Sequence, residues 1–358
     1  MAASPYASSL GRLKADGTSF LSAETYSSLV NAITLDEFTK LLQGTPYGFE
    51  LERARAAYTG ISLLEAAINR TLVRRNRHAF EATPFAGRLV IGAYLKRWDV
   101  ENIAAILSAK TQRRALTVGE TELVSSRDLP AGLFAGAMTL DDFRALLQQP
   151  TVDAVATDLV RFGYGGPLLP LMEEYQRTHD IFPLLHALQV QYYQSVLEAT
   201  RFFQGDEWAV RDLLRSEIDL RNVLLLLKGK DGALPIEEVR GRWLAGGGIA
   251  EGEAADLYGA RDVPDLVERL GGRYPGLAQG NAAYAESKSL ASYDIVLQRE
   301  RTKEELHRLG SYPMSLGGVF TYLLLSEVER GDLRRIAFGI LYGIPPERRR
   351  ALLVSPRA

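Results

Sequence analysis

Paired carboxylates are the side chains of this 358-residue chain whose spacing is best suited to chemistry. They form three clusters, which are Asp99 with Glu101; Glu217 with Asp219; and Glu327 with Glu329 and Asp332. Two neighbouring carboxylates can serve as a general acid and a general base when burial separates their pKa values. An active site is rarely repeated three times in one chain. The recurrence therefore favours a structural role for these residues over catalysis.

Other kinds of site have little support in the sequence. The chain contains no cysteine, which excludes disulfides and cysteine-ligated metal sites. Its four histidines do not follow the H-E-x-x-H pattern or a comparable metal-binding spacing. Gly229-Lys230 lacks the leading glycine and the Ser or Thr of a phosphate-binding loop. We therefore expect no catalytic, cofactor-binding or metal-binding residues.

A helix-start pattern recurs at residues 33–38, 138–143 and 261–266. In each copy a Thr or Asp precedes an acidic residue by three positions, as in a capping box that satisfies unpaired N–H groups of the first turn. We predict helices that begin after Thr34, Thr139 and Asp262. The separations of these residues, 105 and 123 positions, indicate three copies of one structural unit.

A second pattern contains the acidic clusters and recurs at residues 99–103, 219–223 and 329–333. Apolar residues such as Trp98 and Ile103 flank it as in a hydrophobic staple, so we interpret this pattern as another helix start. We expect its polar residues to shape each unit or to contact partners. These candidates are Asp99, Asn102, Glu217, Asp219, Asn222, Glu327, Glu329 and Asp332.

The spacing of apolar residues predicts helices along nearly the whole chain and no convincing strand. The predicted helices span 22–42, 51–77, 88–110, 140–147, 168–203, 207–228, 236–245, 282–309, 317–325 and 332–341. Breaker-rich stretches before residues 139 and 262 separate the copies. The expected fold is all-α, with three similar helical units at 1–125, 126–250 and 251–358.

The composition narrows the class of protein. A hydrophobic content of 46% is enough for substantial cores, and a net charge of -2 argues against a nucleic-acid partner. No stretch reaches the ~20 apolar residues of a membrane-spanning helix, and the first ten residues lack a signal-peptide pattern. We expect a cytosolic protein that reaches a membrane only through a partner.

The second pattern also resembles a known family. The run from Glu217 to Asn222, leading to Gly229-Lys230, is similar to the middle motif of the C subunit of archaeal and bacterial V/A-type ATPases and ATP synthases. That protein is related to the eukaryotic V-ATPase d subunit. The third copy and Thr45-Pro46-Tyr47 look similar as well, although Asp332 stands where the family usually has Asn and Ile340 where it has Lys.

The resemblance implies a non-catalytic rotor subunit without a cofactor. Such proteins are funnels of three helical domains about a pseudo-threefold axis, with a central cavity. They are sockets that couple the central stalk, made of D-type and F-type subunits, to the membrane rotor ring at the cytoplasmic face. The alternatives are a helical scaffold or adaptor of another complex, or an enzyme that uses one acidic cluster. Substituting Glu217 and Asp219 distinguishes an enzyme from a socket. An enzyme would lose turnover but stay stable, whereas a socket would fold or assemble less well.

Overall fold

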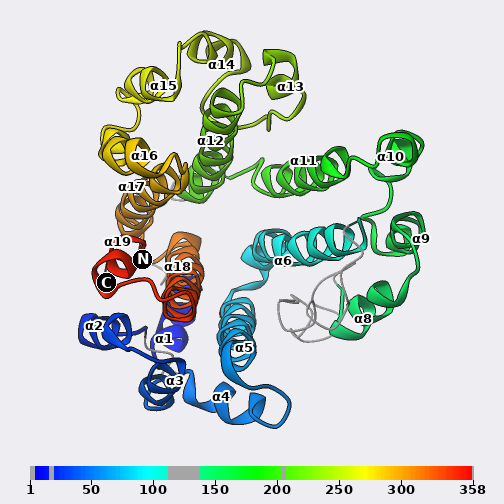
Figure 1. Ribbon diagram of the computed structural model, residues 1–358. Helices are drawn as coiled ribbons and strands as arrows, with labels where there is room; N and C mark the ends of the chain where they lie inside the picture. The colour runs from blue at the N-terminus through cyan, green and yellow to red at the C-terminus, as the bar shows by residue number, and fades with distance from the viewer. Residues whose placement is uncertain (1–4, 16–19, 112–137, 204–206, 357–358) are drawn as a thin grey trace.

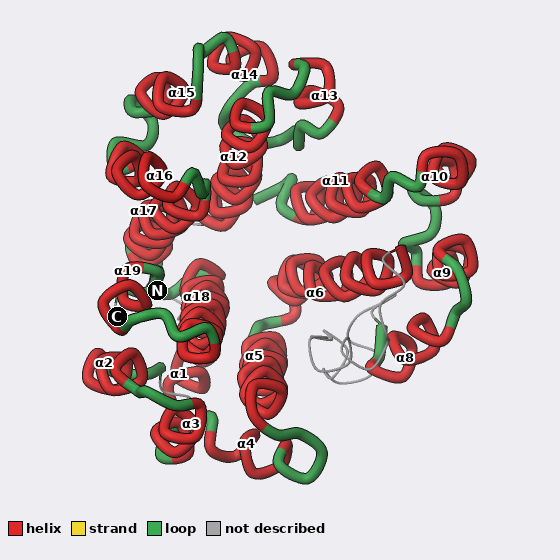
Figure 2. The backbone as a smooth tube through the Cα atoms, viewed as in Figure 1, coloured by secondary structure: helices red, strands yellow, loops and turns green. Residues whose placement is uncertain are grey.

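The computed structural model describes residues 5–15, 20–111, 138–203 and 207–356. All regular elements in these ranges are helices, and Figure 2 shows them joined by loops with no strand. The prediction of an all-α fold is therefore confirmed. No helix in the described part of the chain combines the length and apolar character that crossing a membrane requires.

Among the described residues, six long helices form the inner part of the molecule. They are α5 (Gly60–Ala82), α6 (Phe85–Thr111), α11 (Phe182–Ala199), α12 (Trp208–Asp231), α17 (Ala291–Gly310) and α18 (Leu316–Leu341). They pack mainly in pairs, α5 with α18, α6 with α11 and α12 with α17, and α17 also packs on α18. Figure 1 shows these helices running toward the middle of the view and the short helices around the outside.

Each pair carries its own group of short helices. The first group is α1 (Pro5–Ala15), α2 (Ala23–Asn31), α3 (Leu35–Gln43), α4 (Gly48–Ala54) and α19 (Pro346–Ala351). The second is α8 (Leu140–Gln148), α9 (Val152–Asp158) and α10 (Met172–Thr178), and the third is α13 (Ile236–Gly241), α14 (Glu251–Tyr258), α15 (Val263–Leu270) and α16 (Asn281–Ser287). The short 3-10 helices are η3 (Leu159–Phe162), η4 (Leu169–Leu171) and η6 (Leu277–Gly280).

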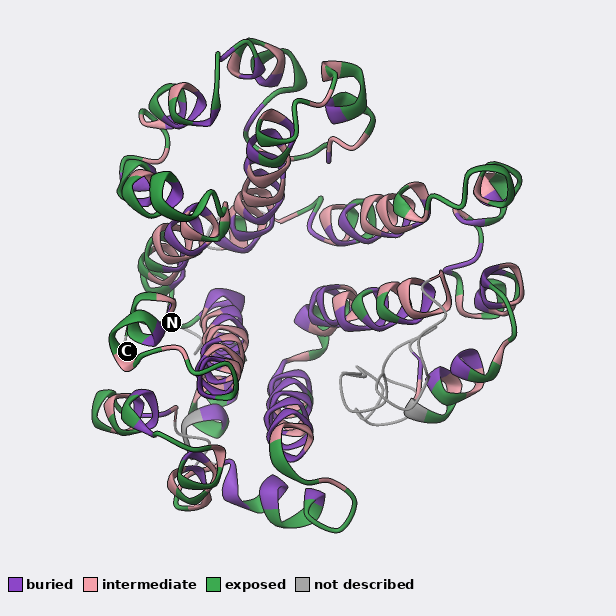
Figure 3. Cartoon of the chain, viewed as in Figure 1, coloured by how far each residue is buried: buried purple, intermediate pink, exposed green. Residues whose placement is uncertain are grey.

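The apolar core follows these groups. One cluster of buried residues contains side chains of helices α2 through α5 and of the end of α18. Another contains side chains of helices α12 through α17. The largest cluster joins α6, α8, α9 and α11 and continues into the starts of α12 and α18. Figure 3 shows that buried positions concentrate on the long helices, whereas exposed positions are frequent on the short ones. The long helices therefore form a continuous inner framework.

The first helix-start pattern is confirmed in all three copies. The Thr34 hydroxyl accepts from the Glu37 N–H at 3.1 Å, and the Asp262 carboxylate accepts from the Asp265 N–H at 2.9 Å. Thr139 forms a complete capping box with Asp142. These side chains satisfy backbone N–H groups that the first helical turn leaves without a partner.

The interpretation of the second pattern as a helix start is wrong. Asp99, Asp219 and Asp332 lie in the interiors of α6, α12 and α18. Their apolar neighbours continue a buried stripe on both sides, so the helices do not begin there. The predicted helices 317–325 and 332–341 are for the same reason one helix, α18.

Other predicted helices are split by caps or turns. The range 22–42 is α2 and α3, 51–77 contains the end of α4 and most of α5, and 168–203 contains α10 and α11. At the last of these breaks, His179 adopts a positive φ of 55° and ends α10. The periodicity continued across each break because both helices bury an apolar side.

The internal repeat is clearest between α12–α13 and α18–α19, whose residue numbers differ by 110. The Leu234 N–H donates to the Gly229 carbonyl at 2.9 Å, and the Ile344 N–H donates to the Gly339 carbonyl at 2.7 Å. Ala233 and Gly343 both have positive φ, and a proline caps the next helix in each copy. The division into units at 1–125, 126–250 and 251–358 stays a prediction, and residue 126 lies outside the described residues.

Candidate functional site

The long helices of different pairs meet at a central pocket of about 410 Å³. Side chains from α6, α12, α17 and α18 line it, and these helices converge in the middle of Figure 1. Its charged lining includes Arg97, Glu217, Arg301, Glu327, Arg330 and Arg335. Two of the predicted candidates, Glu217 and Glu327, are therefore brought together here from distant parts of the chain.

Arg97 of α6 lies between the two carboxylates. One of its terminal nitrogens forms an ion pair with Glu217 of α12, and the other lies 3.3 Å from Glu327 of α18. The Tyr94 hydroxyl donates to Glu327 at 2.9 Å. The Arg97 guanidinium also lies 4.7 Å from the centre of the Tyr94 ring. One cation therefore ties three long helices together.

Glu217 is the most heavily bonded carboxylate of the centre. It accepts from the Tyr193 hydroxyl of α11 at 2.7 Å and lies 3.4 Å from Arg301 of α17. Its side chain is only 4% exposed. A buried charge is tolerated when it is paired and its remaining lone pairs accept hydrogen bonds, and Glu217 meets both conditions.

The two central carboxylates are shifted in opposite directions. Burial raises the pKa of Glu217, but the charges of Arg97 and Arg301 outweigh that effect and lower the pKa to about 2. Burial raises the pKa of Glu327, and Arg97 offsets only part of this rise. Arg97 and Arg301 together balance the two glutamates when both are ionised.

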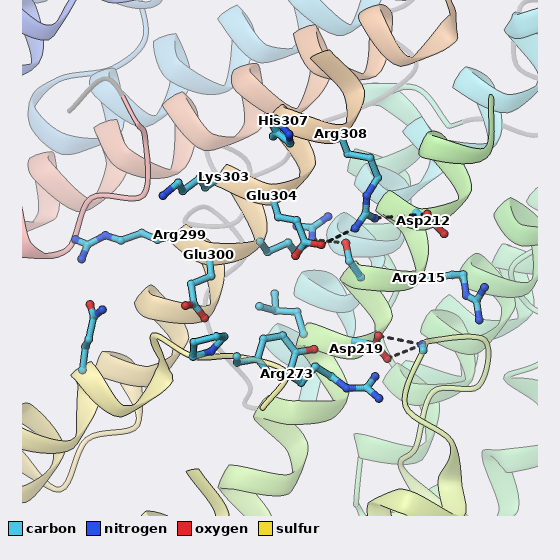
Figure 4. A pocket seen from close by; sticks show the side chains of 17 residues that line it. Asp212, Arg215, Asp219, Arg273, Arg299, Glu300, Lys303, Glu304, His307 and Arg308 are labelled. Carbon is cyan, nitrogen blue, oxygen red and sulfur yellow. Dashed lines mark hydrogen bonds and ion pairs between the residues drawn. The ribbon is translucent and has the colours of Figure 1, made fainter. Parts of the chain in front are cut away.

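Asp219 and Asn222 hold a loop that follows α13. The Asp219 carboxylate accepts from the N–H groups of Gly248 and Ile249 at 2.8 and 3.0 Å, and Figure 4 shows this loop beside it. The Asn222 amide donates to the Leu244 carbonyl at 2.8 Å and accepts its N–H at 3.0 Å. These residues bind backbone groups that would otherwise be buried without partners.

Asp219 also borders a second pocket of about 810 Å³ between α12 and α17 (Figure 4). Its lining carries charges of both signs, and some of them are paired. Arg308 lies between Asp212 and Glu304, and Arg273 lies 3.1 Å from Glu253. The pocket therefore mixes both signs of charge and does not by itself indicate one class of ligand.

Asp332 occupies the repeat position of Asn222, 110 residues later. Its carboxylate accepts from the N–H groups of Val354 and Ser355, each at 2.8 Å. Val354 is likewise 110 residues after Leu244. Asp332 therefore fastens the chain after α19 as Asn222 fastens the chain after α13.

Glu329 is part of a separate buried ion pair between α5 and α18. It lies 2.8 Å from Arg75, and their side chains are 3% and 1% exposed. It also accepts from the Tyr47 hydroxyl at 2.8 Å and the Leu21 N–H at 2.7 Å. Tyr47 belongs to the Thr45-Pro46-Tyr47 stretch, whose role is thus to reach α18.

Asp99 and Asn102 are buried on α6 in the second group. Asp99 accepts from the Tyr164 hydroxyl at 3.1 Å. Across the ranges that the structure describes, no three His, Asp or Glu side chains converge as a metal site would require. Seven of the eight candidates form hydrogen bonds or ion pairs that connect helices or loops, and Asn102 is buried on α6.

Comparison of the sequence with known proteins identifies a family. Residues 10–352 match the sequence profile of the ATP synthase (C/AC39) subunit. The chain belongs to the ATP synthase (C/AC39) subunit family. It is 32% identical to the C subunit of the A-type ATP synthase of Thermoplasma acidophilum over 98% of this chain and 99% of that protein. It is also similar to the corresponding A-type ATP synthase C subunits of Thermoplasma volcanium, 32% identical over 96% of each chain, and of Archaeoglobus fulgidus, 26% identical over 94% and 93%.

Membership of the C/AC39 family confirms the resemblance to the C subunit of V/A-type ATPases. The Asp at position 332, in place of the Asn expected from the resemblance, has a physical explanation. An Asn bonds one backbone N–H and one carbonyl, as Asn222 does, whereas Asp332 accepts two N–H groups. The substitution keeps the loop attached through a different pair of hydrogen bonds.

The acidic pattern in the sequence does not point to the basic partners of these carboxylates, above all Arg97, Arg75 and Arg301. A signal for Arg97 was present in the repeat. It lies 120 residues before Glu217, as Asp99 lies before Asp219, and Glu327 follows Glu217 by 110. Arg97 therefore occupies the repeat position of the two glutamates that it contacts.

Proposed function

We propose that this chain is a non-catalytic coupling subunit of a rotary V/A-type ATPase or ATP synthase. In this role it joins the central stalk, with its D-type and F-type subunits, to the membrane rotor ring. The relatives are C subunits of A-type ATP synthases and match this chain over nearly their whole length, which supports membership of that complex. The proposed location is the cytoplasmic face of the membrane.

The observation that carries this proposal is the buried ion pairing of Arg97 with Glu217 and Glu327. It joins α6, α12 and α18, which belong to three different helix pairs. A part that passes torque must not let its units slide, and a shared buried cation resists sliding because separation would leave uncompensated charges. The arrangement supports a rigid socket better than a site with moving parts.

The proposed shape is a funnel of three related units around the central pocket, with the stalk foot received at its open end. Three helix pairs, each with its own short helices, are consistent with such a funnel. A lasting contact of this kind typically buries ~2,000 Å² or more. We propose that the units follow the divisions at 1–125, 126–250 and 251–358.

Reconstitution tests the proposal. The ATPase assembled without this chain should hydrolyse ATP but fail to drive ion transport, and the added chain should restore transport in proportion to its occupancy. Transport that is equally strong without the chain would refute the coupling role. Recovery of the chain from native membranes without any stalk or ring subunit would also count against it.

A further inference from the structure

A basic groove of about 640 Å³ lies between α4 and α5, away from the central pocket. We call it the arginine groove, and it is lined by Phe49, Arg53, Arg70, Val73, Arg74 and Arg77. Residues 70, 74 and 77 are spaced by four and three positions, so they lie on one face of α5. Four guanidinium groups therefore border one groove.

Few acidic groups neutralise these arginines. Glu50 also lines the groove, but its side chain is only 4% exposed and lies 3.7 Å from Arg53. Arg77 pairs with Glu81 at 2.9 Å. Within the described residues, Arg70 and Arg74 form no ion pair. The groove thus presents positive charge that this part of the chain does not balance.

The guanidinium groups are held in place by neutral contacts. A terminal nitrogen of Arg74 donates to the Pro46 carbonyl at 2.9 Å, while its Nε is buried and has no hydrogen-bond partner among the described residues. Arg70 lies 5.8 Å from the centre of the Tyr58 ring. Such contacts fix the planes of the side chains without cancelling their charge, so less conformational freedom is lost on binding an anion.

An exposed aromatic ring lies among these charges. Phe49 is 58% exposed, and Arg53 and Arg74 lie 5.6 and 5.7 Å from its ring centre. Aromatic rings and arginines are the residue types that most often dominate the binding energy of protein interfaces. The composition of the groove is therefore that of a protein contact.

We propose that the arginine groove docks an acidic helix of a neighbouring protein of the same assembly, which deepens and rests on the proposed function. Arg70 and Arg77 are seven positions apart on α5, which is about 10 Å along its axis. A partner helix with carboxylates one turn apart matches that length and can pair with several guanidinium groups in the bidentate geometry they favour. A single phosphate reaches only part of this span.

A peptide-binding experiment with the full chain tests whether the arginine groove recognises negative charge. The probe is a fluorescent alanine-based helical peptide with glutamates one turn apart, compared with the same peptide carrying glutamines. We expect anisotropy to show at least tenfold tighter binding of the glutamate peptide, and this preference to fall as salt is raised. The variant R53E/R70E, which leaves the Arg74 contact with Pro46 intact, should lose the preference.

The control variant R161E/R201E reverses two exposed arginines, Arg161 of η3 and Arg201 just after α11, each paired with a nearby acid. It should bind the glutamate peptide like the wild type. Equal binding of the two peptides, or an unchanged R53E/R70E variant, overturns the proposal. Tighter binding to phosphatidylglycerol vesicles, or to inorganic phosphate, than to the peptide also overturns it by assigning the groove to a lipid surface or a simple anion.

An assembly assay with stalk and ring subunits distinguishes a failure of this inference from a failure of the proposed function. If the wild-type chain assembles with stalk and ring subunits and R53E/R70E does so at least tenfold less, the docking surface is supported. If both assemble equally, the coupling role stands and the docking surface fails. If the wild type itself does not assemble, the proposed function fails first.

Discussion

Replacing Glu217 by Gln tests whether the central ion pairs hold the molecule together. The substitution keeps the shape of the side chain and an oxygen that can accept from the Tyr193 hydroxyl, 2.7 Å away in the native protein. It removes the negative charge that faces Arg97 and Arg301. Arg97 would then keep only its ion pair with Glu327, and Arg301 would lose its ion pair with Glu217.

The size of the effect follows from the pKa of Glu217. It is lowered from 4.5 to about 2, and each pKa unit corresponds to about 1.4 kcal/mol, so ionisation of Glu217 contributes about 3 kcal/mol to folding at neutral pH. Breaking a buried pair by removing one partner typically costs about 3–5 kcal/mol. The two arguments agree, and we expect the Gln variant to lose about 3 kcal/mol.

Urea unfolding of the purified chain measures this loss. The matched control is Glu304→Gln, because the Glu304 side chain is 66% exposed and its pairing with Arg308 should be worth less than about 1 kcal/mol. A loss of under about 1 kcal/mol for Glu217→Gln would refute the structural reasoning. A fully stable variant that had lost a catalytic turnover would point instead to the enzyme alternative.

Three further predictions use the same framework. Because the pKa of Glu217 is lowered in the folded protein, its carboxylate is protonated at a higher pH in the unfolded chain than in the folded one. The stabilising contribution of Glu217 should therefore be present above about pH 5 and be lost toward pH 2. In Glu217→Gln, the free energy of unfolding should depend less on pH in this range. Gly229→Ala should lower the free energy of unfolding, measured in urea, by about 1–3 kcal/mol, because a Cβ there would lie 2.8 Å from a Val239 methyl. The control is Gly252→Ala on an exposed helix surface, where the added Cβ meets no other atom and the change should be neutral or slightly stabilising. Asp332→Ala should cost about 1–3 kcal/mol and speed hydrogen exchange at the Val354 N–H, which loses its 2.8 Å partner.

The sequence predicted the fold class and the first set of helix starts because both depend on neighbours in the chain. Thr34, Thr139 and Asp262 each bond an N–H three residues away, and such a contact can be seen in a short window. The tertiary role of Asp219 could not be seen in this way. Its partners, Gly248 and Ile249, are 29 and 30 residues distant, and flanking apolar residues made it look like a local cap.

The candidate site was predicted in its acidic half only. The carboxylates recur in the sequence, and this recurrence points to Glu217 and Glu327. Recurrence does not point to Arg97, because the repeat position that carries Glu in two copies carries Arg in the first. Recurrence of residue type therefore misses a position whose function requires the copies to differ.

This difference between copies has an electrostatic cause. Equivalent positions of a repeat that meet at one point bring equivalent side chains together, and three buried carboxylates there would repel one another without any compensating charge. Arg97 in one copy converts that repulsion into two attractions, to Glu217 and to Glu327. Repeat copies that meet through buried charged side chains therefore need different residues at the position where they touch.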